Sequence, residues 1–139
     1  MFGASDSLPD GNIPKTVGVL VSDPLGDAIT TGDGKAYIRI HPAVNGMNLT
    51  AVGASVSTVS SSGTVTVQLR RVRSGSPADM LSTKLTIDAS ETDSNTAAAA
   101  AVIDTANDDV ATGDQIFVDI DVAGTGAKGL FVSLTFTTP

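Results

Sequence analysis

Side chains capable of acid–base or metal chemistry are unevenly distributed along this chain. Nine carboxylates lie between Asp88 and Asp121, and no Lys or Arg occurs from residue 85 to residue 127. Hard cations such as Ca²⁺ are bound by clusters of carboxylate oxygens. The sequence lacks the D-x-[DN]-x-[DN]-G spacing of an EF-hand. We therefore interpret residues 88–121 as a solvated acidic surface and predict no metal site, with a Ca²⁺ site in this segment as the alternative.

Candidates for nucleophilic or general-base catalysis are few. His41 is the only histidine, and it precedes Pro42 where a strand is expected to end. The chain has no Cys and no G-x-S-x-G motif, which excludes a thiol nucleophile and the nucleophile elbow of hydrolases. Glycoside hydrolysis uses two carboxylates across a cleft, usually with aromatic walls, and aromatic residues make up only 4% of this chain. We predict no catalytic residues, no cofactor and no enzymatic activity.

Two glycine-rich stretches match phosphate-binding loops only in part. Gly124, Gly126 and Gly129 fit G-x-G-x-x-G, but a strand pattern follows them where a dinucleotide site needs a helix. The stretch 32–35, Gly-Asp-Gly-Lys, lacks the first glycine and the final Ser or Thr of a P-loop. Both stretches are predicted to be turns, and residues 124–129 are predicted to close a hairpin.

Arg70, Arg71 and Arg73 form the only cluster of basic residues in the sequence. In a strand Arg71 and Arg73 share one face, while Arg70 points to the other. The cluster has two possible roles: cross-strand pairing with the chain's own carboxylates, or contact of Arg71 and Arg73 with an acidic neighbouring subunit. The net charge of −7 argues against binding to nucleic acid or to an anionic membrane surface. No apolar run of 18 residues is present that could span a membrane.

The elements that position these side chains are predicted to be strands. Fourteen of the fifteen acidic residues are Asp, which favours turns, and Val and Thr, which favour strands, are abundant. A change of phase at residues 71–72 predicts a β-bulge, and residues 88–114 are predicted to be a loop with a short strand or one helical turn. The pattern indicates an antiparallel β-sandwich, jelly-roll-like, of about seven or eight strands. Apolar and polar residues alternate most clearly along 36–40, 65–69, 116–122 and 130–136.

The chain is predicted to consist of an extended N-terminal arm, residues 1–34, and a β-sandwich domain, residues 35–139. Three prolines keep the arm extended. The arm either clamps the subunit to its neighbours or to a larger shell, or it folds over its own domain. Its candidate partner-binding residues are the spaced apolar ones, Phe2, Leu8, Ile13, Val17, Val19 and Leu20.

Five stretches from residue 31 onward carry a resemblance to a known family. They are 31–37 (TGDGKAY), 45–49 (NGMNL), 79–88 (DMLSTKLTID), 102–114 (VIDTANDDVATGD) and 129–136 (GLFVSLTF). In these stretches the chain resembles a family of small β-sandwich structural proteins and modules of tailed bacteriophages and prophages. Members of that family serve as capsid decoration (cement) proteins or as parts of tail fibres.

The resemblance implies a virion structural protein located on the capsid surface. Its expected function is that of a capsid decoration protein, which binds and stabilises the shell as a homo-oligomer. The expected partner is the major capsid protein or another virion protein. A closed ring would let exposed Val and Thr strands bury edges and faces against identical neighbours, and a trimer is the expected state. A tail-fibre or receptor-binding module is the alternative.

Overall fold

Period-two alternation along the chain produces strands that each bury one face. The computed structural model describes residues 13–139, and its ten strands within that range form an all-β fold. The predicted antiparallel β-sandwich is therefore confirmed, with more strands than the seven or eight expected. The strands are β1 (Lys15–Leu20), β2 (Gly32–Arg39), β3 (Asn48–Ser55), β4 (Val65–Arg73), β5 (Ser76–Asp79), β6 (Leu81–Thr83), β7 (Leu85–Ile87), β8 (Val102–Ile103), β9 (Gln115–Ala123) and β10 (Phe131–Thr137).

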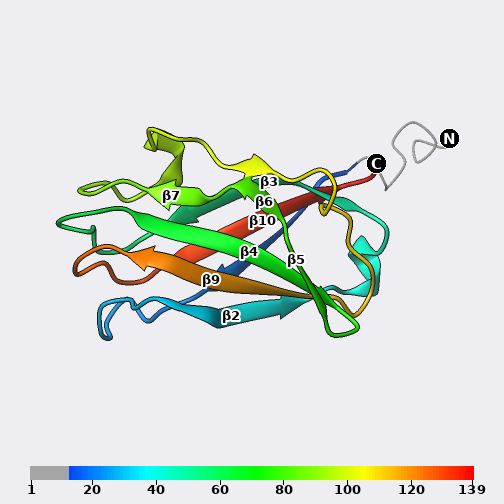
Figure 1. The fold of residues 1–139 in the computed structure, drawn as a ribbon, viewed down its shortest axis with the longest axis horizontal. Coiled ribbons are helices and arrows are strands. Elements are labelled where there is room, and N and C mark those ends of the chain that lie inside the picture. Colours follow the sequence, from blue (N-terminus) through cyan, green and yellow to red (C-terminus); the bar gives the residue numbers. More distant parts are fainter. Residues whose placement is uncertain (1–12) are drawn as a thin grey trace, which may run out of the picture.

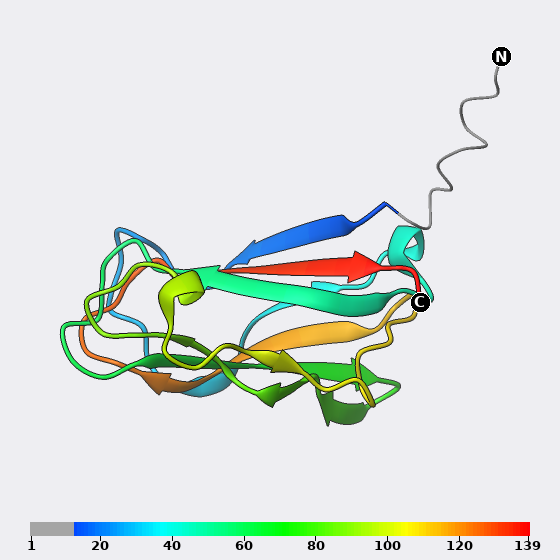
Figure 2. The ribbon, with the colours of Figure 1, turned by 90° about the horizontal axis from the view of Figure 1, so that it is seen from above.

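Two antiparallel sheets face each other across the core (Figures 1 and 2). The first sheet has the order β1-β10-β3, so the first described strand pairs with the last. The second sheet has the order β2-β9-β4, and the far edge of β4 is shared by β5 and β7. A separate pair, β6-β8, lies beside them. These pairings establish the sandwich, while the jelly-roll description stays a prediction.

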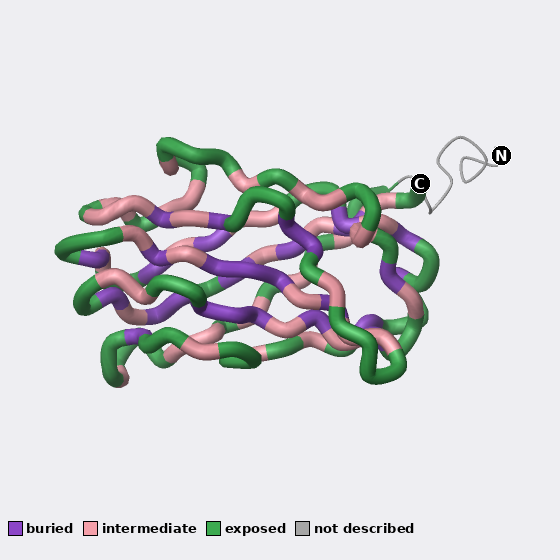
Figure 3. The backbone as a smooth tube through the Cα atoms, viewed as in Figure 1, coloured by how far each residue is buried: buried purple, intermediate pink, exposed green. Residues whose placement is uncertain are grey.

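The core lies between the two sheets and is lined by the inward faces of their central strands. Figure 3 shows buried residues running through the middle of the molecule and exposed residues in the end loops. Because alternate residues of a strand point to opposite faces, every second residue of β10 and of β9 up to Ile120 is buried. These buried residues are Ile116, Val118 and Ile120 of β9 and Val132, Leu134 and Phe136 of β10.

The polarity change near Arg71 arises without the predicted bulge. β4 keeps its register with β9 and β5 through this region, and its only register shift against β9 lies between Thr66 and Val67. Val67, Leu69 and Arg71 follow one another on the inner face of β4. Arg71 can follow the apolar residues on this face because it lies near the end of the sandwich, where Asp109 pairs with its guanidinium. The predicted β-bulge at residues 71–72 is wrong.

Residues 124–129 form a turn, as predicted, but they do not close a hairpin. β9 is flanked on both sides by β2 and β4, so it has no free edge for β10. The chain instead crosses from one sheet to the other, with positive φ angles at Gly124, Gly126 and Gly129. The 88–114 segment holds one 3-10 helix, η4 (Ser94–Thr96), and the two-residue β8, which confirms its predicted character.

The boundary between arm and domain lies earlier than residue 34. β1 pairs with β10 along its whole length, from Lys15 opposite Phe136 to Leu20 opposite Phe131. β2 begins at Gly32 and extends into the predicted domain. Residues 15–20 therefore belong to the sandwich as an edge strand, because β10 is paired with β3 on one side only and leaves its other edge open to β1. Among residues 13–139 no helix is long and apolar enough to cross a membrane.

Candidate functional site

The arginines predicted to contact a neighbouring subunit have partners in their own chain. Arg71 Nη1 lies 2.9 Å from Asp109 Oδ1, and Arg73 Nη1 lies 3.1 Å from Asp109 Oδ2. Arg73 also makes a two-pronged contact with Asp114, with Nε 3.0 Å from Oδ1 and Nη2 2.7 Å from Oδ2. These contacts join the end of β4 to the loop before β9. They support the cross-strand pairing role of Arg71 and Arg73.

The electrostatics of this network favour the charged forms of its members. Burial opposes ionisation of Asp114, but the hydrogen bonds from Arg73 outweigh it and hold the pKa of Asp114 below its usual range. Asp109 behaves in the same way: desolvation is outweighed by the bonds from Arg73 and Arg71, and its pKa is lowered. The hydrogen bond to Asp114 raises the pKa of Arg73. The network therefore tethers the 109–114 loop to β4.

Arg70 points to the opposite face of β4, as the alternation predicts. Its Nε donates to Asp119 Oδ2 at 2.8 Å and its Nη2 to Asp119 Oδ1 at 3.0 Å, while the guanidinium lies 4.8 Å from the ring centroid of Phe117. Asp119 also accepts the Gly34 N–H at 2.7 Å. Asp119 is only 4% exposed, so this contact satisfies a buried carboxylate.

The acidic segment is only partly the solvated surface that its sequence predicts. Asp114 and Asp119 are buried and paired with arginines, and Asp121 pairs with Lys84 at 2.8 Å. The sequence offers pairing with the chain's own carboxylates as one role of the arginines, but it does not identify the partners, because the arginines lie more than 35 residues away along the chain. Among residues 13–139 no group of three or more potential ligands is arranged to hold a metal ion.

His41 has a structural role at the end of β2. Its Nδ1 accepts the Ala43 N–H at 3.0 Å and so begins the 3-10 helix η3 (Pro42–Val44). Gly32 and Gly34, from the second glycine-rich stretch, have positive φ angles where β2 bulges against β9. Local backbone geometry thus explains the positions of His41 and of the glycines of the 32–35 stretch.

The arm residues divide into three groups. Phe2 and Leu8 lie outside the described residues. Val17 and Val19 are partly buried and pack on the core, so their described contacts lie within their own domain. Ile13 and Leu20 are exposed, at 47% and 53%. Among the described arm residues, Ile13 and Leu20 are therefore the ones whose side chains are open to contact with a partner.

On the outer face of the β1-β10-β3 sheet the three strands carry no charged side chain, and we call it the neutral face; Asp93, which bridges Ser55, lies at its rim. On β1 and β10, exposed or half-buried residues alternate with those that face the core. The Oγ1 atoms of Thr16 and Thr135 lie 3.0 Å apart across it. The neutral face consists of Thr16, Gly18 and Leu20 of β1, Ala51, Gly53 and Ser55 of β3, and Phe131, Ser133, Thr135 and Thr137 of β10.

Phe131 shapes the neutral face. Its ring lies across Gly18 of the neighbouring strand, so a Cβ at position 18 would displace the ring from this place. Beside the ring is a hollow of about 160 Å³, lined in part by Gly53 and Ser133 and bounded at its rim by Asp93. Apart from Leu20 and the exposed ring of Phe131, the face is composed of small side chains.

The opposite outer face, on the β2-β9-β4 sheet, is charged. It carries the Arg70–Asp119 and Lys84–Asp121 pairs. Tyr37 also lies on this face, with its ring centroid 5.1 Å from that of Phe117. The two outer faces of the sandwich thus differ sharply in charge, a difference that residue spacing alone did not reveal because it depends on which strands share a sheet.

Comparison with known proteins adds no relative: no protein-family model, no curated protein and no solved structure matches this chain.

Proposed function

We propose that this chain is a virion structural protein of a tailed bacteriophage, a capsid decoration protein that binds the shell as a homo-oligomer. The sequence resemblance suggests the class. The observation that carries the proposal is the neutral face, since a charge-free sheet surface on a protein of net charge −7 is suited to contact with another protein. The neutral face binds the shell, and the charged opposite face points to solvent.

The size of the neutral face supports an oligomer. Three strands about 4.8 Å apart and about 20 Å long give a sheet area of roughly 300 Å². A stable protein–protein interface buries about 800 Å² per partner, so one neutral face binds weakly by itself. A symmetric trimer presents three such faces to a threefold position of the shell, and the combined attachment is far tighter than that of one subunit.

A tail-fibre or receptor-binding module is the second candidate, and one observation favours it. The rings of Tyr37 and Phe117 lie side by side on the charged face, with Arg70 stacked on Phe117. Tyr37 is 54% exposed. Exposed aromatic rings beside polar groups are suited to a flat ligand such as a sugar ring. This patch holds one exposed Tyr only, and the neutral face is the larger feature.

The proposal is tested with particles of the encoding phage prepared without this protein. The Leu20→Asp variant places a carboxylate on the neutral face, and the matched control, Val122→Asp, places one at a 46% exposed site on the other sheet. Because an unpaired carboxylate is costly to bury at an interface, Leu20→Asp binds particles at least tenfold more weakly, whereas Val122→Asp binds like the unmodified protein. Equal binding of Leu20→Asp and the unmodified protein refutes the role of the neutral face. Binding to tails alone favours the second candidate.

A further inference from the structure

The outer edge of β3 is paired with other segments only at its two ends. At one end Asn48 forms a bridge with Asp109, and the Leu49 N–H donates to the Asp108 carbonyl at 2.8 Å. At the other end Ser55 bridges Asp93, and the residue after it continues this pairing. Both bridges are antiparallel. Between them the chain from residue 94 to residue 107 leaves the edge of β3.

The middle of this edge is open. The Ala54 N–H points away from β10 and donates to Ser94 Oγ at 3.0 Å. Alternation along a strand places the N–H and C=O of Val52 on the same side as those of Ala54. Within residues 13–139 these Val52 groups have no backbone partner. An open edge of this kind is a template for an added strand.

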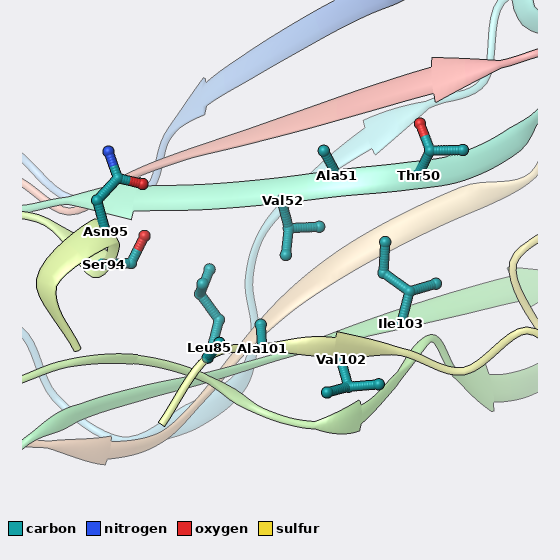
Figure 4. A pocket seen from close by; sticks show the side chains of 10 residues that line it. Thr50, Ala51, Val52, Leu85, Ser94, Asn95, Ala101, Val102 and Ile103 are labelled. Atoms are coloured by element: carbon teal, nitrogen blue, oxygen red, sulfur yellow. The ribbon is translucent and has the colours of Figure 1, made fainter. Parts of the chain in front are cut away.

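A groove of about 490 Å³ lies along this open edge (Figure 4). Its sides are β3 and the segment 100–103, and the side chains of Val52 and Ile103 point toward each other across it. Leu85 and Ala101 lie together on the side opposite β3, and no charged residue lines the groove. The groove thus offers an uncharged lining beside unpaired backbone groups, with apolar side chains toward β8 and the polar Thr50, Ser94 and Asn95 along β3 and η4. This combination suits an extended peptide.

We propose that this groove receives the segment Phe2–Ser5 of a neighbouring copy, added as a strand antiparallel to β3. The inference deepens the proposed function, on which it rests, by naming what holds the oligomer together. In an added strand, Phe2 and Ala4 share one face and Gly3 and Ser5 the other. Phe2 and Ala4 enter the groove toward Val52 and Ile103, and the small residues Gly3 and Ser5 extend the neutral face beside β3.

The position of the described N-terminus supports supply by a neighbour. Lys15 opens β1 opposite Phe136, which itself lies opposite Leu49 of β3. Twelve residues precede Ile13, and an extended chain of that length reaches about 40 Å. This reach is enough to enter the groove of an adjacent subunit. Entry into its own groove would require the chain to reverse direction across the end of its sheet within residues 6–14, whereas the groove of an adjacent subunit can lie in line with β1 and needs no such reversal.

Cysteine cross-linking tests the assignment directly, because the chain has no native Cys. Ala4→Cys protein is mixed with Ala101→Cys protein and treated with a short bismaleimide. The expected result is a covalent dimer of the two variants. Ser76→Cys, at an exposed site on β5, replaces Ala101→Cys as the control and gives at least tenfold less dimer. Absence of the dimer overturns the proposal. Internal cross-linking of the doubly substituted chain, without the mixed dimer, shows that the groove takes its own segment and also overturns it.

Self-association of the full chain provides a second, independent test. Ala101→Glu places a carboxylate in the groove, and Ala99→Glu places one at an exposed site of the same segment that does not line it. Light scattering across a concentration series measures the dissociation constant of the oligomer. This constant is expected to rise at least tenfold for Ala101→Glu and to stay within twofold of that of the unmodified protein for Ala99→Glu. Unchanged association of a folded Ala101→Glu overturns the proposal. Neither test uses particles, so a failure here is distinguishable from a failure of particle binding.

Discussion

Substitution of Asp114 by Asn separates intramolecular pairing of the arginine cluster from contact between subunits. Asp114 is 3% exposed and accepts three hydrogen bonds from Nε and Nη2 of Arg73 and one from the Ala111 N–H. Asn keeps the shape and an acceptor oxygen but loses the charge. Charge-assisted hydrogen bonds contribute about 1.5–3 kcal/mol, and Arg73 is partly solvated and keeps Asp109 as a partner. We therefore expect a loss of about 2 kcal/mol at pH 7.

The pH dependence of this loss follows from the lowered pKa of Asp114. The unfolded chain protonates this carboxyl near pH 3.9, and the folded protein protonates it at a lower pH. The stabilisation by the charged form is therefore complete above the unfolded pKa and is lost as the pH falls through the folded one. Below that point the protonated Asp resembles Asn. The difference between Asp114→Asn and the unmodified protein should therefore begin to shrink as the pH falls through the unfolded pKa, and it should close once the pH is below the folded one.

Urea unfolding followed by circular dichroism at several pH values measures this difference. The control is Asp27→Asn, at an exposed site with no ion pair among the described residues, and it should change stability by less than about 0.5 kcal/mol. The loss in Asp114→Asn should not depend on protein concentration, because the pair lies within one chain. A loss that varies with concentration, or that is the same at pH 2.5 and pH 7, would refute the intramolecular account.

Three further outcomes are expected. Gly124→Ala should destabilise the fold by at least 1 kcal/mol more than Gly126→Ala in thermal melts, because both glycines have positive φ but only the Cβ at position 124 would overlap Ser60; equal losses contradict this reasoning. Arg70→Ala should cost about 3 kcal/mol in urea unfolding by leaving buried Asp119 without its cation, and a loss below about 1 kcal/mol would show that the pair is dispensable. EDTA should leave the melting temperature unchanged, and a fall of several degrees would favour the Ca²⁺ alternative.

The strands that the sequence predicts best are those with one face in the core. Residues 116–120 and 130–136 alternate because each strand pairs on both edges and turns one apolar face to the core, while Asp119 is buried on the other face by its pairing with Arg70. The sequence predicts an arm where β1 lies, because the valines of this segment are separated by Gly18 and flanked by prolines. Its place in the sheet depends on the open edge of β10, a long-range pairing that local pattern does not encode.

The features of the candidate site were harder to predict for the same reason. The pairing of Arg73 with Asp114 joins residues 41 positions apart, and sequence reasoning could offer it only as one of two roles for the cluster. The neutral face is assembled from three strands that are distant in the sequence, each contributing only a few uncharged residues. The groove exists because residues 94–107 leave the edge of β3, which no residue type in that segment indicates.

The most direct test of the proposed function is a cryo-electron microscopy map of the encoding phage, detailed enough to place the sandwich. The account predicts threefold clusters of this chain on the capsid, with the β1-β10-β3 sheet against the shell and the Arg70–Asp119 face in solvent. Density for the chain on the tail alone, or on the capsid with the charged face against the shell, would contradict it.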